Sequence, residues 1–144
     1  MIPFEEQVTF AMIRAMKAHF RRSAPRLAEL GLQLGQDMLL RLLWEKDGLS
    51  QSELIARLGV EPPTVTKAIG RLEKEGLVTR RRDPDDARVS RVHLTPRARR
   101  LRDPVMQVWA DMEARALAGL STEERQTLRA LSLRVRANLE APDE

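Results

Sequence analysis

The sequence predicts a mainly helical fold with one small β-hairpin, and two patterns support this. Apolar residues recur at steps of three and four along most of the 144 residues, as they do in helices with one buried face. Residues 89–94 instead alternate with a period of two, and the turn-forming run Asp83-Pro84-Asp85-Asp86 separates them from residues 77–82. That arrangement is typical of two strands joined by a polar loop.

Two helices are expected in the N-terminal third. Residues 4–22 carry an apolar stripe, and Pro25 is expected to interrupt that helix because proline has no amide hydrogen to donate. A second helix is expected over residues 34–46, where Asp47-Gly48 forms a turn that ends it. Its inner face is expected to consist of Met38, Leu39, Leu42 and Leu43.

The next two helices are short and joined by a tight turn, which is the helix-turn-helix plan. Ser50 and Glu53 have the spacing of a capping box, and Gly59 stands where the first of these helices would end. Pro62 and Pro63 suit the first turn of the second helix, where a missing amide hydrogen costs nothing. The inner face of that second helix is expected to consist of Val65, Ile69 and Leu72.

The C-terminal part is again helical. Thr95-Pro96 opens a long segment, within which Pro104 is expected to produce a kink or a break. Ser121 and Glu124 form a second capping-box sequence ahead of the last helix.

Three apolar stripes exceed what a small lobe can cover, so a two-fold interface with a second copy of the chain would bury them. The alternative is that these helices cover one another within one chain. The stripes lie in residues 4–16, 101–117 and 128–139.

These elements divide the chain into three parts. Residues 48–95 form a winged helix-turn-helix lobe, in which the hairpin is the wing. Residues 1–47 supply N-terminal dimerisation helices and the start of that lobe, and residues 96–144 supply C-terminal dimerisation helices. The expected fold class is therefore mainly α with a small β-hairpin wing.

The composition narrows the class of function. The chain has no cysteine and two histidines, which excludes disulfides and thiolate sites and makes a zinc site improbable, so neither a metal nor a cofactor is expected. The first residues lack the apolar core of a signal peptide and no apolar run could span a bilayer, so we expect a cytoplasmic protein. The net charge is +4, and most of the positive charge is arginine. Arginine suits phosphate and guanine recognition, although a codon bias would give the same excess.

Two surfaces are candidates for binding double-stranded DNA. The start of the second short helix combines hydroxyl side chains, a cation and amide groups that suit phosphate. Its candidate residues are Pro63, Thr64, Thr66, Lys67 and, one turn further on, Arg71. The hairpin carries a basic patch suited to phosphate and minor-groove contact. Its candidate residues are Arg80, Arg81, Asp86, Arg88 and Arg91. On a strand, Asp86 and Arg88 would share a face, so that the carboxylate could hold the guanidinium extended. The alternative for each residue is an ordinary solvated surface.

The same residues carry a family resemblance. The stretch Asp86-Ala87-Arg88-Val89-Ser90-Arg91-Val92-His93-Leu94-Thr95 resembles the wing signature of the MarR family, an Asp-x-Arg followed at fixed spacing by Leu-Thr. Residues 50–78, SQSELIARLGVEPPTVTKAIGRLEKEGLV, are similar to the helix-turn-helix of that family. Ile55 departs from the pattern, because the family commonly has a small residue there. The order of elements along the whole chain also fits.

The resemblance implies a homodimeric, ligand-responsive transcriptional repressor that binds a pseudo-palindromic operator. The terminal helices would interlock with those of a second subunit, the recognition helix would enter the major groove, and the wing would reach the minor groove. Many members of the family bind a small aromatic or phenolic effector between the helical and winged lobes. The candidate effector contacts are His19, Trp44 and Trp109, each of which also fits an ordinary core or surface position.

Two other classes of function are alternatives to a DNA-binding regulator. An enzyme would need the hairpin residues Asp83, Asp85, Asp86 and His93 to act together, but a solvated turn explains them and no second element supplies partners. A winged-helix module that binds proteins and not DNA is the other alternative. Such a module would carry an acidic or apolar recognition helix, whereas this helix is polar and basic.

Overall fold

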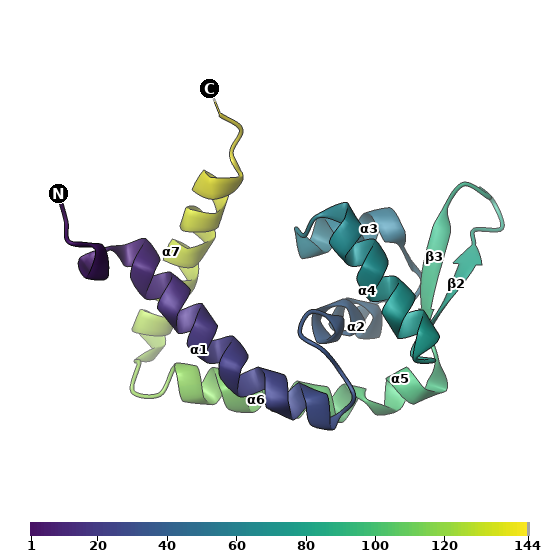
Figure 1. The fold of residues 1–144 in the computed structure, drawn as a ribbon, viewed down its shortest axis with the longest axis horizontal. Helices are drawn as coiled ribbons and strands as arrows, with labels where there is room; N and C mark the ends of the chain where they lie inside the picture. Colours follow the sequence, from purple (N-terminus) through teal and green to yellow (C-terminus); the bar gives the residue numbers. More distant parts are fainter. Residues whose placement is uncertain (144) are drawn as a thin grey trace.

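The structure, a computed structural model, describes residues 1–143; residue 144, the end of the expected C-terminal part, lies outside the described residues. The elements in order are a 3₁₀ turn (Phe4–Glu6), α1 (Val8–Glu29), α2 (Gln36–Glu45), β1 (Leu49–Ser50), α3 (Gln51–Leu58), α4 (Pro62–Lys74), β2 (Val78–Arg82), β3 (Ser90–Leu94), α5 (Pro96–Arg100), α6 (Arg102–Ala116) and α7 (Thr122–Glu140). Figure 1 shows a lobe of α2, α3, α4 and the strands on one side, with α1, α6 and α7 extending away from it. The expected fold class is confirmed.

Helix α1 continues through Pro25, so the expected interruption there is wrong. Ser23 and Leu27, two residues before and after the proline, are buried. This part of α1 lies along α6 (Figure 1), and that packing keeps the helix continuous although one backbone hydrogen bond is lost. The helix also begins later than expected, at Val8, after the separate 3₁₀ turn.

The inner face of α2 differs from the expected one. Leu39 and Leu43 are buried as expected, but the third buried leucine is Leu40, whereas Met38 is 41% exposed and Leu42 is partly buried. Helix α2 contacts α3, α4, α6 and β3, so its buried face is set by several neighbours and not by one stripe. Met38 instead lines two cavities described below.

The helix-turn-helix forms as expected. Ser50 Oγ accepts a hydrogen bond from the Glu53 amide (3.0 Å), and Glu53 Oε2 accepts one from the Ser50 amide (2.8 Å), which completes the capping box of α3. Gly59 ends α3 in the left-handed region, with φ of +62°, where a side chain would be strained. Helix α4 then buries its inner face, Val65, Ile69 and Leu72.

The hairpin belongs to a three-stranded antiparallel sheet of order β1-β3-β2. Strand β1 has only two residues and was not expected from the sequence. We use "the wing" for β2, β3 and the loop of residues 83–89 that joins them. Asp86 and Arg88 lie in this loop, so the shared face of a strand is not what brings them together.

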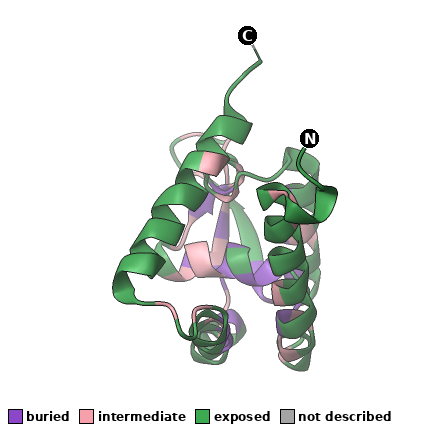
Figure 2. Ribbon diagram, turned by 90° about the vertical axis from the view of Figure 1, so that its left-hand side faces the viewer, coloured by how far each residue is buried: buried purple, intermediate pink, exposed green. Residues whose placement is uncertain are grey.

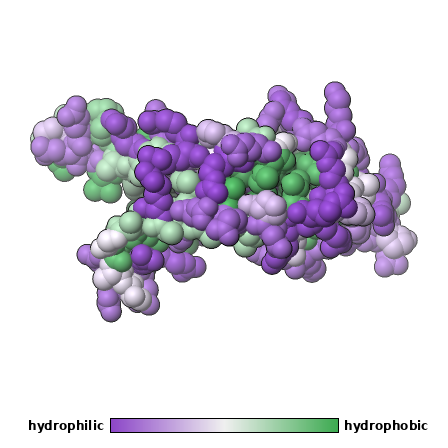
Figure 3. All heavy atoms as spheres, turned by 90° about the horizontal axis from the view of Figure 1, so that it is seen from below, coloured by the Kyte–Doolittle hydropathy of each residue, from purple (hydrophilic) through white to green (hydrophobic). Residues whose placement is uncertain are grey.

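The last helix leaves apolar side chains uncovered, but the stripe of residues 101–117 does not need a second copy as expected, because Val105, Val108 and Met112 are buried within the chain. The long segment breaks at Leu101, three residues before Pro104, as expected. No residue of α7 (Thr122–Glu140) is buried, and Figure 2 shows most of α1 and α7 as exposed. Viewed from below, Figure 3 shows apolar side chains between charged ones on the face that includes α1 and α6. Exposed apolar residues include Val8, Ile13, Met16, Leu128, Leu131 and Leu139. Among residues 1–143, no helix is long and apolar enough to cross a membrane.

Candidate nucleic-acid interface

The start of α4 presents side chains but no free amide hydrogens. Pro62 and Pro63 have none, and the amides of Thr64 and Val65 both donate to the Glu61 carbonyl, at 3.0 and 3.2 Å. The expectation that free amides here would bind phosphate is therefore wrong. The dipole of the helix still favours an anion at this end. Direct contacts from the first four residues of α4 would therefore be made by side chains.

The exposed side chains of α4 fall into two groups. Thr64 and Lys67 extend into solvent next to Pro63. Thr66 Oγ donates to the Pro62 carbonyl at 3.0 Å and accepts from Gln51 Nε2 at 2.8 Å, so Gln51 at the start of α3 fixes its orientation. Gln51 was not singled out from the sequence.

Arg71, one turn further along α4, is directed towards the connection between α1 and α2. Its Nη1 donates to Gln33 Oε1 at 2.7 Å. Arg71 therefore links the recognition helix to this connection, and it also lines the larger cavity described below.

The wing carries a shallow basic hollow on its surface. The hollow is lined by Arg80, Arg81, Arg82, Ala87, Arg88 and Ser90. Arg80 pairs with Glu73 of α4 at 3.1 Å, and its hydrogen bond lowers the pKa of Glu73. Arg82 donates to the Ala87 carbonyl at 2.8 Å across the loop. In Figure 1 the start of α4 and the loop of the wing both lie at the upper side of the lobe. These two surfaces therefore lie on the same side of the lobe.

Asp86 and Arg88 form the expected pair. Arg88 donates from Nε to Asp86 Oδ1 at 3.1 Å and from Nη2 to Oδ2 at 3.3 Å. The hydrogen bond from Arg88 lowers the pKa of Asp86, so the carboxylate stays ionised. The Arg88 side chain is nevertheless 92% exposed. It is held in one direction and still free to contact a ligand.

Arg91 is directed inward, unlike the other wing arginines. Its Nε donates to Asp83 Oδ2 and its Nη1 donates to the Gly48 carbonyl at 3.0 Å. The sequence pattern placed Arg91 among the arginines that face DNA and Asp83 in the turn, with no indication that the two side chains meet. Both residues instead join the loop of the wing to the base of the sheet.

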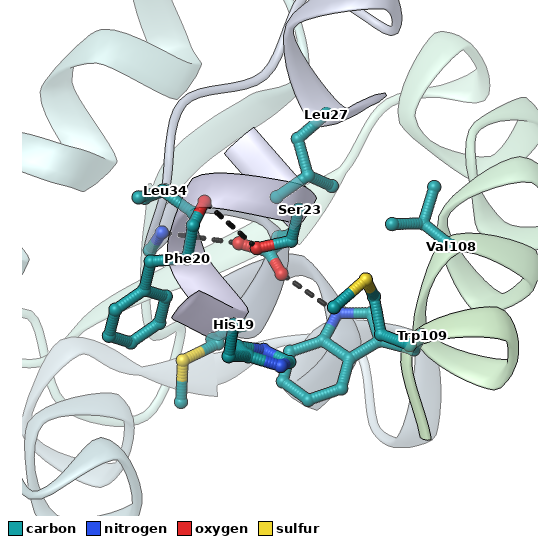
Figure 4. A pocket seen from close by; sticks show the side chains of 11 residues that line it. His19, Phe20, Ser23, Leu27, Leu34, Val108 and Trp109 are labelled. Carbon is teal, nitrogen blue, oxygen red and sulfur yellow. Dashed lines mark hydrogen bonds between the residues drawn. The ribbon is translucent and has the colours of Figure 1, made fainter. Parts of the chain in front are cut away.

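A small pocket between α1, α2 and α6 contains two of the three candidate effector contacts (Figure 4). The His19 and Trp109 rings lie side by side, with centroids 5.8 Å apart, and Trp109 Nε1 donates to the buried Asp37 Oδ2 at 2.8 Å. The free volume is about 20 Å³, which is room for about one water molecule. Trp44 lies elsewhere and donates to the Ala98 carbonyl at 3.1 Å.

A larger cavity of about 170 Å³ adjoins this pocket and reaches α4. Leu34, Gly35 and Met38 line both spaces. The side chain of Gln36 is buried in its wall, and in residues 1–143 its Nε2 has no hydrogen-bond partner. The polar or charged residues that line this cavity are Gln33, Gln36, Thr64, Lys67 and Arg71. This cavity could not be predicted from the sequence, because its residues come from three separate segments.

The comparisons with known proteins agree with this geometry. The model of the MarR family matches residues 32–90. The uncharacterized HTH-type transcriptional regulator YdgJ of Bacillus subtilis is 33% identical over 76% of this chain. The match covers 66% of the length of YdgJ, just under two thirds. A putative transcriptional regulatory protein for the hcr operon of Thauera aromatica is 32% identical over 94% of this chain and 83% of its own length. The structure of BpsR from Bordetella bronchiseptica, described as showing how 6-hydroxynicotinic acid regulates its DNA binding, superposes with a TM-score of 0.86 at 25% identity and covers 99% of both chains.

Proposed function

Because this chain belongs to the MarR family of transcriptional regulators, which are not enzymes, we propose that it binds a pseudo-palindromic operator as a homodimer and represses transcription. The observation that carries the proposal is that the basic hollow of the wing and the exposed start of α4 lie on the same side of the lobe (Figure 1). Arginines in such a hollow neutralise phosphates and release counterions, which drives binding to DNA.

In this proposal α4 enters the major groove and the wing reaches the minor groove. Thr64 and Lys67 would contact base edges or phosphates directly, since α4 offers no free amide at its start. Thr66 is oriented by Gln51 and would make a contact of fixed direction. Arg80, Arg81 and Arg88 would contact the backbone and the minor groove.

Homodimerisation is proposed from the uncovered apolar side chains of α1 and α7. Leu131 is 50% exposed and Val8 is 72% exposed on helices that do not cover each other. A two-fold interface would bury both faces and would support the expected division into a winged lobe at residues 48–95 and dimerisation helices on either side. The two recognition helices would then face successive major grooves, roughly 34 Å apart.

We also propose that a small aromatic effector binds in the larger cavity and not in the His19–Trp109 pocket. The pocket is nearly filled by its own side chains, whereas the cavity offers about 170 Å³ and a buried donor, Gln36 Nε2, that has no partner within residues 1–143. Because Lys67 and Arg71 line the same cavity, an effector there would displace residues of the recognition helix and weaken DNA binding.

The test is a titration of the purified chain with the DNA upstream of its own gene and with a scrambled duplex, each at two salt concentrations. We expect tight binding to the upstream DNA, weaker binding to the scrambled duplex, and a steep loss of affinity with salt. Equal and weak binding to both duplexes would refute specific regulation of that site. Binding to neither duplex at low salt would favour the alternative, a winged module that binds proteins.

A further inference from the structure

One of the side chains that connect the wing to the rest of the lobe is Arg91, at the base of the sheet. Arg91 lies on the central strand β3, opposite Ser50 on β1 and Arg81 on β2. Its Nη1 donates to the Gly48 carbonyl at 3.0 Å and lies 3.8 Å from Glu53 Oε2. Glu53 is the residue that closes the capping box of α3. Arg91 is therefore attached to the start of the helix-turn-helix through one hydrogen bond and one ion pair.

The other side of the Arg91 guanidinium holds the loop of the wing. Its Nε donates to Asp83 Oδ2, and the Asp83 side chain is only 14% exposed. Asp83 Oδ1 accepts from the amides of Asp85 and Asp86, at 2.8 and 3.0 Å. The pKa of Asp83 is lowered, first by the hydrogen bond from Arg91 and then by these two amides, so the carboxylate is charged at neutral pH.

The network continues to the tip of the wing. Asp86, whose amide is held by Asp83, in turn accepts two hydrogen bonds from the Arg88 side chain. A continuous series of contacts thus runs from the N-cap of α3 through Arg91 and Asp83 to Arg88. The step between Glu53 and Arg91 is an ion pair at 3.8 Å, and the other steps are charge-assisted hydrogen bonds or hydrogen bonds to backbone groups, which fix direction as well as distance.

We propose that Arg91 and Asp83 are positioning residues for DNA binding: they orient Arg88 relative to α4 and do not themselves contact DNA. The inference rests on the proposed function, because orientation matters only if Arg88 binds DNA. A lysine could not replace Arg91, because a single ammonium group cannot contact Asp83 and Gly48 from opposite sides of a planar fork.

The first experiment measures the order of the wing without DNA. The chain contains no cysteine, so Ala87→Cys provides one labelling site in the loop for a nitroxide probe. We expect Arg91→Gln and Asp83→Asn to increase the mobility of the probe in the folded protein. The matched control is Arg81→Gln, which removes the same charge from the position paired with Arg91 on β2 and should leave the spectrum unchanged. Circular dichroism confirms that each variant is folded.

The second experiment is a double-mutant cycle for binding to a duplex selected from a random pool. We expect Arg91→Gln alone to weaken binding about tenfold, but less than about twofold in an Arg88→Ala background, because both changes remove the same contact. Additive losses would overturn the proposal, since they would mean that Arg91 contacts DNA independently. An unchanged probe spectrum in both Arg91→Gln and Asp83→Asn would also overturn it. If the unmodified chain selects no duplex, the proposed function fails, while the probe spectra still decide whether Arg91 orders the wing.

Discussion

Replacing Arg88 by alanine should weaken DNA binding without affecting folding. The side chain is 92% exposed and forms its ion pair with Asp86 in the same loop. Exposed ion pairs contribute little to stability, so the melting temperature should stay within about 2 °C of that of the unmodified chain. The wing strands keep their pairing, because Arg88 lies in the loop and outside the ladder between β2 and β3.

The expected loss of affinity follows from the two wings of the proposed homodimer, each of which carries one Arg88. An arginine that reads a groove contributes about 1–3 kcal/mol to binding. A homodimer that carries Arg88→Ala in both subunits loses this twice, so the smallest expected loss is about 2 kcal/mol. That corresponds to a Kd about 30-fold higher.

The assay is fluorescence anisotropy with a labelled duplex selected by the unmodified chain. Arg115→Ala is the matched control, since it removes an exposed arginine at the end of α6, far from the wing in Figure 1. A loss smaller than about threefold for Arg88→Ala, or an equal loss for the control, would refute the role of the wing. A small loss for Arg88→Ala would mean that Arg88 contacts no DNA. An equal loss for Arg115→Ala would mean that affinity depends only on the net charge of the protein.

Three further predictions concern stability. Ser50→Ala should lower the free energy of unfolding by about 0.5–2 kcal/mol in urea titrations, because the Glu53 amide loses its capping acceptor. Trp109→Phe should cost about 1–3 kcal/mol in the same assay, because the buried Asp37 Oδ2 loses its donor. Acidification should also destabilise the fold, since hydrogen bonds from Arg91 and Arg26 lower the pKa values of Asp83 and Asp111. The two ion pairs stabilise the fold fully above the ordinary aspartate pKa, and this stabilisation is lost as the pH falls through the lowered pKa values. The urea concentration at the unfolding midpoint should therefore stay constant between pH 5 and 7 and decrease when the pH is lowered below about 4.

Local signals predicted the helix-turn-helix well. A capping box, a helix-ending glycine and two prolines at a helix start each act within one turn of backbone, so their effect does not depend on the remainder of the fold. Pro25 shows the limit of that reasoning. Its local effect was correctly stated, but contact with α6, far along the chain, decided the outcome. The prediction of the buried face of α2 was wrong for the same reason, because four neighbouring elements determine which residues are buried.

The residues of the candidate DNA-binding site could be predicted from the sequence better than the directions of their side chains. Asp86 and Arg88 are close in sequence and were paired correctly, although on a loop and not on a strand. Arg91 could not be separated from the exposed arginines, because its direction depends on β1, a strand too short to leave a pattern in the sequence. Since β1 ends at Ser50, the N-cap of α3, the strand that brings the Gly48 carbonyl to Arg91 also fixes where the helix-turn-helix begins. The orientation of the wing and the start of the DNA-binding helices are thus set by the same few residues, and a change at this junction should affect both.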